Sequence, residues 1–124
     1  MYSKAQVIDG LVYFNTLRPR RLWNAVKIFL SYHASKITKK NYHRGLPISL
    51  SLEPTTSCNL RCPECPSGLR AFSRPIGMLE PEINKKVIDQ LHKQLTYITY
   101  YFQGEPYLNK DFTDMVSYAT KHNI

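Results

Sequence analysis

Two strand patterns, each followed by a helical pattern, constrain the fold of this chain more than any other feature. Residues 48–53, ISLSLE, alternate apolar and polar side chains, and a helical pattern follows over 81–95. Residues 97–102 are rich in aromatic and β-branched side chains, and a helix is expected from 110 to 121 with Asn109 as its cap. Repeated strand–helix units predict parallel strands with helices outside them. The predicted fold class is α/β.

Two such units are too few for a complete parallel sheet, because both faces and both edges of the sheet need cover. The pattern stops at 122–124, where a helix has ended and a third strand would begin. We therefore expect the first two βα units of a partial (β/α)6 barrel of the TIM type. Residues 1–46 are predicted to form a basic helical leader, and residues 47–124 the truncated core domain.

The leader carries the whole charge excess. Residues 1–50 contain nine of the 17 Lys and Arg but only one acid, Asp9, which accounts for the formal charge of +8. An amphipathic helix is predicted from Arg20 to Ile37, where apolar residues recur at helical spacing: Leu22, Val26, Phe29, Leu30 and Ile37. Such a segment suits packing on the rest of the fold, an anionic membrane surface or nucleic acid. We favour packing, and regard nucleic acid as an unlikely partner.

The sequence predicts a cytoplasmic location. Its longest uncharged run, 94–104, has 11 residues, whereas a spanning helix needs about 20 apolar residues. Asp9 lies where an export signal would need its apolar centre. Three cysteines cannot all pair within one chain, and a reducing compartment keeps thiols free to act as thiolate ligands.

All three cysteines lie within SCNLRCPECP, residues 57–66, directly after the first strand. Cys58, Cys62 and Cys65 form C-x3-C-x2-C, and both Fe–S clusters and Zn²⁺ accept thiolates. Zinc would need a fourth ligand such as His43 or His92. A [4Fe–4S] cluster held by three cysteines keeps one iron open for a substrate or cofactor. Three unliganded thiols are the remaining alternative, and they would be an oxidation liability.

The chain resembles the radical S-adenosylmethionine (radical SAM) enzymes over roughly 47–124. The resemblance rests on CNLRCPEC after one strand and QGEP after the next. It implies that Cys58, Cys62 and Cys65 ligate three irons of a [4Fe–4S] cluster while SAM chelates the fourth. It also implies that Gly104, Glu105 and Pro106 lie at the methionine end of SAM, with Glu105 as an acceptor for its ammonium group.

The resemblance implies reductive cleavage of SAM to a 5′-deoxyadenosyl radical that takes hydrogen from a substrate, with a flavodoxin or ferredoxin as electron donor. EPTTSCNLRCPECP followed by GLR is most similar to the subgroup that carries a SPASM extension, whose members often modify peptides or proteins. Two residues depart from the commoner pattern: Gln103 replaces a glycine, and Glu64 replaces an aromatic residue.

This chain alone is expected to be inactive. The arginines at 61, 70 and 74 would offset the negative charge of the cluster, or they are ordinary solvated surface residues. A zinc-binding module or a non-catalytic Fe–S protein remains an alternative.

Overall fold

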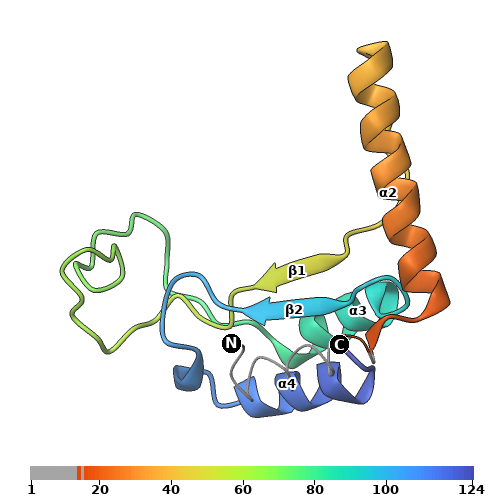
Figure 1. Ribbon diagram of the computed structural model, residues 1–124. Helices are drawn as coiled ribbons and strands as arrows, with labels where there is room; N and C mark the ends of the chain where they lie inside the picture. Colours follow the sequence, from red (N-terminus) through yellow and green to blue (C-terminus); the bar gives the residue numbers. More distant parts are fainter. Residues whose placement is uncertain (1–13, 15) are drawn as a thin grey trace, which may run out of the picture.

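The computed structural model describes residue 14 and residues 16–124, where two βα units form a body and one long helix stands beside it (Figure 1). The elements are α2 Pro19–Thr38, β1 Ser49–Leu52, α3 Pro81–Leu91, β2 Tyr97–Tyr100, the 3-10 helix η1 Pro106–Leu108 and α4 Phe112–Lys121. Part of the predicted leader, residues 1–13 and 15, lies outside the described residues. The α/β class is confirmed, and the barrel stays a prediction.

The sheet of the described residues has two parallel strands. Ser49 lies opposite Tyr97 and Leu52 opposite Tyr100, so the strands are in register along their whole length. Each strand is two residues shorter than the sequence pattern predicts. On β2 the reason is local: the Tyr101 amide still donates to the Leu52 carbonyl at 3.0 Å, but Phe102 takes a φ of 142° and turns the chain away.

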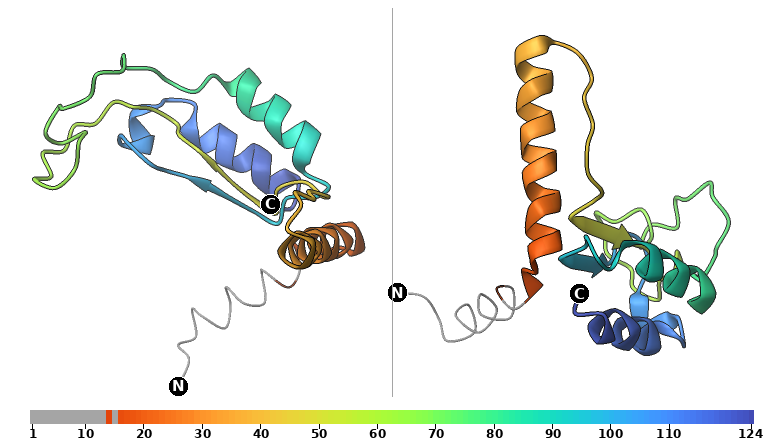
Figure 2. Two further views of the ribbon diagram at one scale, coloured as in Figure 1. Left: turned by 90° about the horizontal axis from the view of Figure 1, so that it is seen from above. Right: turned by 90° about the vertical axis from the view of Figure 1, so that its right-hand side faces the viewer.

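Helices α3 and α4 lie together on one side of the sheet (Figure 2). The fully buried apolar core is small and consists of Ile88, Leu95, Met115 and Ala119. The Tyr100 hydroxyl joins β2 to both helices, because it lies 2.7 Å from Asn84 Oδ1 on α3 and 3.2 Å from the Met115 carbonyl on α4. Burial raises the pKa of Tyr100 to about 12, and the bond to Asn84 partly offsets this shift.

Helix α3 ends at Leu91, four residues before the predicted end at Leu95. The chain turns because Thr96 must pair with β1, and its amide donates to the Ile48 carbonyl at 2.8 Å. Leu95 is nevertheless completely buried. The periodicity thus identified a core residue correctly but assigned it to a helix instead of a turn.

Arg21 joins α2 to the body. Its guanidinium donates to the carbonyls of His92 (2.8 Å), His122 (3.3 Å) and Asn123 (2.6 Å), which lie at the carboxyl-terminal ends of α3 and α4. A cation at a helix carboxyl terminus satisfies free carbonyls and opposes the negative end of the helix dipole. One side chain therefore caps two helices and sets the position of a third.

The segment after α2 runs back along the helix (Figure 2). Lys39 ends the helix in a left-handed conformation, with φ 58°. Asn24 then holds the returning segment, because its side chain donates to the Leu46 carbonyl at 2.7 Å and accepts from the Leu46 amide at 2.8 Å. Together with the Arg21 contacts, these bonds fix the rotation of α2 about its own axis.

Candidate functional site

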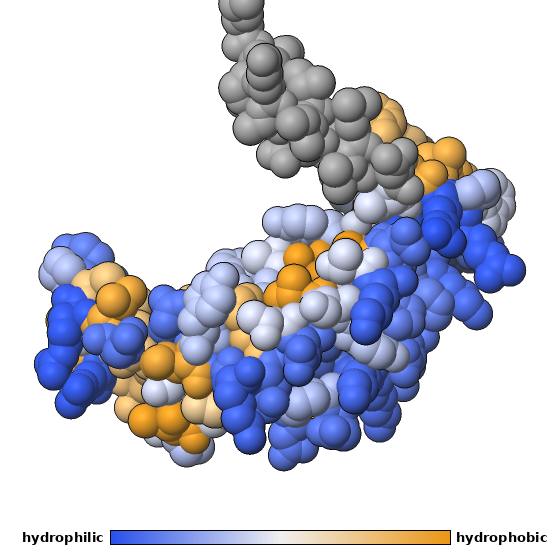
Figure 3. Space-filling model, turned by 90° about the horizontal axis from the view of Figure 1, so that it is seen from below, coloured by the Kyte–Doolittle hydropathy of each residue, from blue (hydrophilic) through white to orange (hydrophobic). Residues whose placement is uncertain are grey.

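The loops that carry both predicted motifs leave the same edge of the sheet. Residues 53–80 follow β1 and contain the cysteines, and residues 101–111 follow β2 and contain Gly-Glu-Pro. The first loop projects beyond the carboxyl ends of the strands (Figure 1). Hydrophobic surface gathers at this end of the molecule, whereas the surface over α4 is mainly hydrophilic (Figure 3). Barrel enzymes place their active sites at this edge.

Gly104 packs directly against the chain that leads into the cysteines. A Cβ at this position would lie 2.2 Å from the Thr55 carbonyl oxygen and 2.7 Å from that of Ser57, and Gly104 has a φ of +85°. Only glycine fits both the space and the conformation. The next amide, that of Glu105, donates to the Ser57 carbonyl at 2.8 Å. The Gly-Glu-Pro motif is thus bonded to the residue immediately before Cys58.

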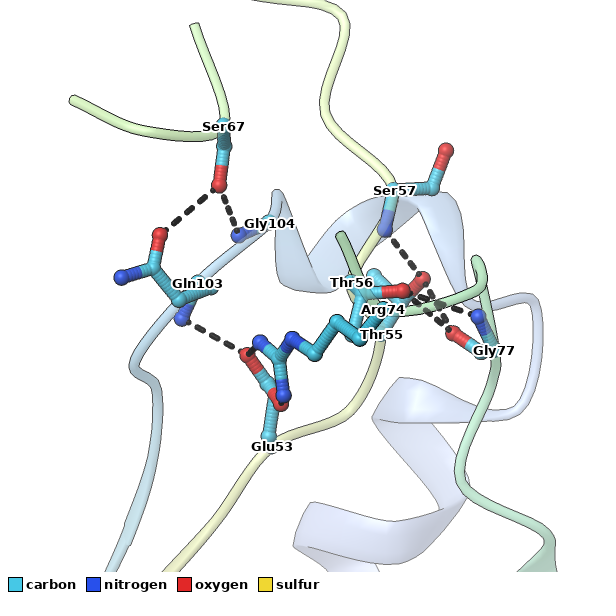
Figure 4. Close-up of polar contacts among 9 residues, drawn as sticks. All are labelled: Glu53, Thr55, Thr56, Ser57, Ser67, Arg74, Gly77, Gln103 and Gly104. Atoms are coloured by element: carbon cyan, nitrogen blue, oxygen red, sulfur yellow. Dashed lines mark hydrogen bonds and ion pairs between the residues drawn. The ribbon is translucent and has the colours of Figure 1, made fainter. Parts of the chain in front are cut away.

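Ser67 ties the far end of the cysteine loop to the same place (Figure 4). Its hydroxyl donates to Gln103 Oε1 at 3.0 Å and accepts from the Gly104 amide at 3.2 Å. Gln103, which departs from the commoner glycine, therefore has a defined partner. Residues on both sides of the three cysteines converge on the loop after β2.

Glu53 adds a charged contact to this network. Both of its oxygens pair with Arg74, at 2.8 and 2.9 Å, and Oε1 also accepts from the Gln103 amide at 2.9 Å. Arg74 was expected to offset the charge of a cluster. A bidentate pair with a carboxylate occupies the guanidinium, and its effect on a cluster stays a prediction.

Hydrogen bonds from backbone and hydroxyl groups close the base of the cysteine loop (Figure 4). The Thr56 amide donates to the Gly77 carbonyl at 3.1 Å, and the Gly77 amide donates to Thr56 Oγ1 at 2.8 Å. Buried Asn109 completes the closure, since its amide group donates to the carbonyls of Pro54 and Leu79 at 2.8 and 3.0 Å. Its Oδ1 accepts from the Asp111 amide, next to α4. The prediction of Asn109 as the cap of a helix from 110 is wrong, because α4 begins at Phe112 with Asp111 as its N-cap, and Asn109 instead closes the loop.

The cysteines are unpaired thiols with backbone donors nearby. Cys62 is exposed, and Cys58 and Cys65 are partly exposed. The Leu60 amide lies 3.4 Å from Cys58 Sγ. Backbone N–H groups of Gly68 and then Ser67 lower the pKa of the Cys65 thiol, against a smaller opposing effect of desolvation. N–H donors directed at sulfur favour the thiolate, the form that soft metals bind, so the donors fit an iron–sulfur cluster chemically.

Gly68 brings the second half of the cysteine loop against Cys62. A Cβ on Gly68 would lie 2.4 Å from the Cys62 carbonyl oxygen and 2.5 Å from its amide nitrogen. The loop therefore folds back on itself over the middle cysteine. Among the described residues, however, no three His, Cys, Asp or Glu side chains are grouped closely enough to hold a metal ion. The assignment of Cys58, Cys62 and Cys65 as ligands stays a prediction.

The histidines named as fourth ligands of a zinc site lie elsewhere. His92 follows α3 and precedes β2, so it lies near the amino edge of the sheet, where its ring packs against His122 with centroids 5.1 Å apart. His43 precedes β1. The cysteine loop leaves the opposite edge of the sheet, so the described fold does not bring either histidine to the cysteines.

Glu105 has a local role that the sequence did not indicate. Its Oε1 accepts from the Tyr107 amide at 3.4 Å, a long bond that caps the 3-10 helix at Pro106–Leu108. The carboxylate is partly exposed and keeps a free oxygen. Its predicted contact with an ammonium group stays untested.

A scan against protein-family models finds no match. The chain is 36% identical over 87 residues to the mycofactocin maturase MftC of Mycobacterium tuberculosis strain H37Rv. The aligned residues make up 68% of this chain and 22% of that protein. The MftC protein of Mycolicibacterium smegmatis is 34% identical over the same length and shares. The PqqA peptide cyclase of Rhodopseudomonas palustris is 31% identical over 77 residues, 62% of this chain and 20% of that protein.

These relatives are radical SAM proteins of the SPASM type. The chain belongs to the radical SAM family. It spans about a fifth of the length of the curated relatives that it matches. The family uses a [4Fe–4S] cluster and SAM, as the resemblance implied.

The radical SAM motifs were visible in the sequence, but the residues that join them were not. Ser67, Glu53 and Asn109 each connect two loops through a side chain. Glu53 and Ser67 stand at the two ends of the motif region in the sequence. In the sequence, these residues are marked only as polar residues beside a strand end or a turn. Many ordinary surface residues fit the same description.

Proposed function

We propose that this chain is the amino-terminal part of a radical SAM enzyme that modifies a peptide or protein. Cys58, Cys62 and Cys65 would ligate the cluster, and the loop 104–106 would hold the methionine end of SAM. The observation that carries the proposal is the bond from the Glu105 amide to the Ser57 carbonyl at 2.8 Å. It holds the two motifs together at the edge of a parallel sheet where ligands bind.

The residues of this chain would act by binding and positioning. Backbone donors at Ser67 and Gly68 favour the thiolate of Cys65. Ser67 and Gln103 fix the second motif against the cysteine loop at 3.0 Å. When bound, the cluster and SAM supply a one-electron cleavage of SAM to methionine and a 5′-deoxyadenosyl radical, which removes a hydrogen atom from the substrate.

A peptide is the proposed substrate class because the name of one relative, the PqqA peptide cyclase, states a peptide substrate. The proposed electron donor is a flavodoxin or ferredoxin. We also propose a cytoplasmic location, where the three free thiols stay reduced until a cluster is inserted. The strands and loops that would complete the site are not supplied by the two βα units, so this chain alone is expected not to turn over substrate.

The test is anaerobic reconstitution with iron and sulfide, followed by metal analysis and EPR spectroscopy with and without SAM. We expect a [4Fe–4S] signal that changes when SAM is added. Alanine at Cys58, Cys62 or Cys65 should abolish the signal, whereas Ser73→Ala, at an exposed position of the same loop, should leave it intact. Tightly bound zinc without iron would contradict the proposal, and an EPR signal unaffected by SAM would indicate a non-catalytic Fe–S protein.

A further inference from the structure

Helix α2 buries polar residues and exposes apolar ones. Arg21, Asn24 and Ser31 are at most 7% exposed, although they are polar. On the other side, Leu22, Trp23, Phe29, Leu30 and Ile37 each expose between 58% and 79% of their surface. At 100° per residue these five side chains fall on one continuous face of the helix. The predicted amphipathic helix is present, but its apolar face does not pack on the body.

The helix cannot simply turn this apolar face inward. The buried side chains are committed to the body: Arg21 caps α3 and α4, and Asn24 holds both the amide and the carbonyl of Leu46. Rotation about the helix axis would break all of these bonds and leave carbonyl groups at two helix ends without a partner. Within the described residues, these contacts therefore hold the apolar face away from the body.

The surroundings of this face are strongly cationic. No acidic residue occurs between Gly10 and Leu52, whereas arginine or lysine occurs at 18, 20, 21, 27, 36, 39, 40 and 44, from the N-cap of α2 to the segment after the helix. The exposed lysines Lys27 and Lys36 flank the apolar face on its two sides. Figure 1 shows the helix projecting beyond the sheet. A partner for this surface must be apolar in the middle and anionic around it.

A second copy of the chain does not meet this requirement, because an isologous contact would bring the same cations face to face. No described helix has the length and hydropathy needed to cross a bilayer. A helix with cations beside a face of Trp, Phe and Leu is suited to lie in the headgroup region of a membrane. We propose that α2 lies on an anionic phospholipid surface, with Trp23, Phe29 and Ile37 toward the acyl chains.

Trp23 is the single tryptophan of the chain, so its fluorescence reports directly on this face. The full chain is titrated with vesicles of phosphatidylglycerol mixed with phosphatidylcholine, and with vesicles of phosphatidylcholine alone. We expect a blue shift of Trp23 emission and co-sedimentation with the anionic vesicles. Binding to phosphatidylcholine alone should be at least tenfold weaker, and added salt should weaken binding to the anionic vesicles.

Matched variants separate the apolar and the electrostatic contributions. Phe29→Ser should weaken binding about tenfold, and the double variant Lys36→Gln/Lys39→Gln about 25-fold, since each cation near the surface contributes about fivefold. The controls are Ile76→Ser and Lys85→Gln/Lys86→Gln, which change equally exposed residues away from α2. Circular dichroism of every variant verifies that the helices are retained.

Several outcomes would overturn the proposal. One is no Trp23 shift with anionic vesicles while the helical signal is intact. A second is equal affinity for both kinds of vesicle, and a third is equal loss of binding in the control variants. A blue shift that depends on protein concentration without vesicles would assign the face to self-association, and tighter binding to duplex DNA would assign it to nucleic acid. None of these results depends on whether the chain binds a cluster.

Discussion

Gly104→Ala is the sharpest perturbation of the candidate site. The new Cβ would lie 2.2 Å from the Thr55 carbonyl oxygen, and the residue would have to keep a φ of +85°. A left-handed conformation costs a residue with a side chain about 1–2 kcal/mol. Overpacking against fixed backbone costs about 1–3 kcal/mol more. We expect a loss of about 2–5 kcal/mol in the free energy of unfolding, or separation of the two loops if the loop after β2 moves instead.

The assay pairs thermal unfolding with the EPR response to SAM in the reconstituted chain. A fall of about 10 °C in the unfolding midpoint would indicate that the clash is retained and destabilises the fold. Loss of the SAM response with a normal midpoint would indicate that the loop after β2 has moved away. Gly77→Ala is the matched control, because nothing lies within 4 Å of its added Cβ. If both variants unfold at the same temperature and respond equally to SAM, the close approach of Gly104 does not position the site.

Three further predictions concern side chains that join elements. Ser67→Ala removes a donor and an acceptor between two loops, so it should cost about 1–2 kcal/mol and weaken the effect of SAM on the EPR signal. Arg21→Lys cannot reproduce the forked contacts to three carbonyls, so denaturant unfolding should show a loss of about 2–4 kcal/mol in the free energy of unfolding. The control Arg20→Lys should change this free energy by about zero. The pKa of Tyr100 is raised from 10 to about 12, so its hydroxyl contributes stability below pH 10 that is lost as the pH rises toward 12. Tyr100→Phe should therefore flatten the stability profile between these pH values, and an unchanged slope would contradict the assignment.

The sequence predicted the elements because their signals are local. Alternation at 48–53 and helical spacing at 81–95 follow from burial of one face, and both elements exist close to their expected bounds. The ends were less accurate, since they depend on tertiary contacts. Leu95 belongs to a turn because Thr96 pairs with Ile48, a residue distant in the sequence.

The sequence predicted the motifs of the site but not the contacts that hold them. Cys58, Cys62 and Cys65 stand close together in the sequence, and their chemistry is specific. The bond between Ser67 and Gln103 joins residues 36 positions apart, and that between Glu53 and the Gln103 amide spans 50 positions. Serine and glutamate have many ordinary surface roles, so nothing in their spacing distinguishes these two from solvated side chains.

The contacts of Arg21 impose an order on folding during synthesis. The bond from Arg21 to the Asn123 carbonyl joins residues 102 positions apart, so α2 leaves the ribosome long before the carbonyls that Arg21 caps have been made. At about 5–20 residues per second, that interval is roughly 5–20 s. Throughout it, the guanidinium has no carbonyl of α4 to bind. Among the described elements, α2 is therefore made first but fixed in place last.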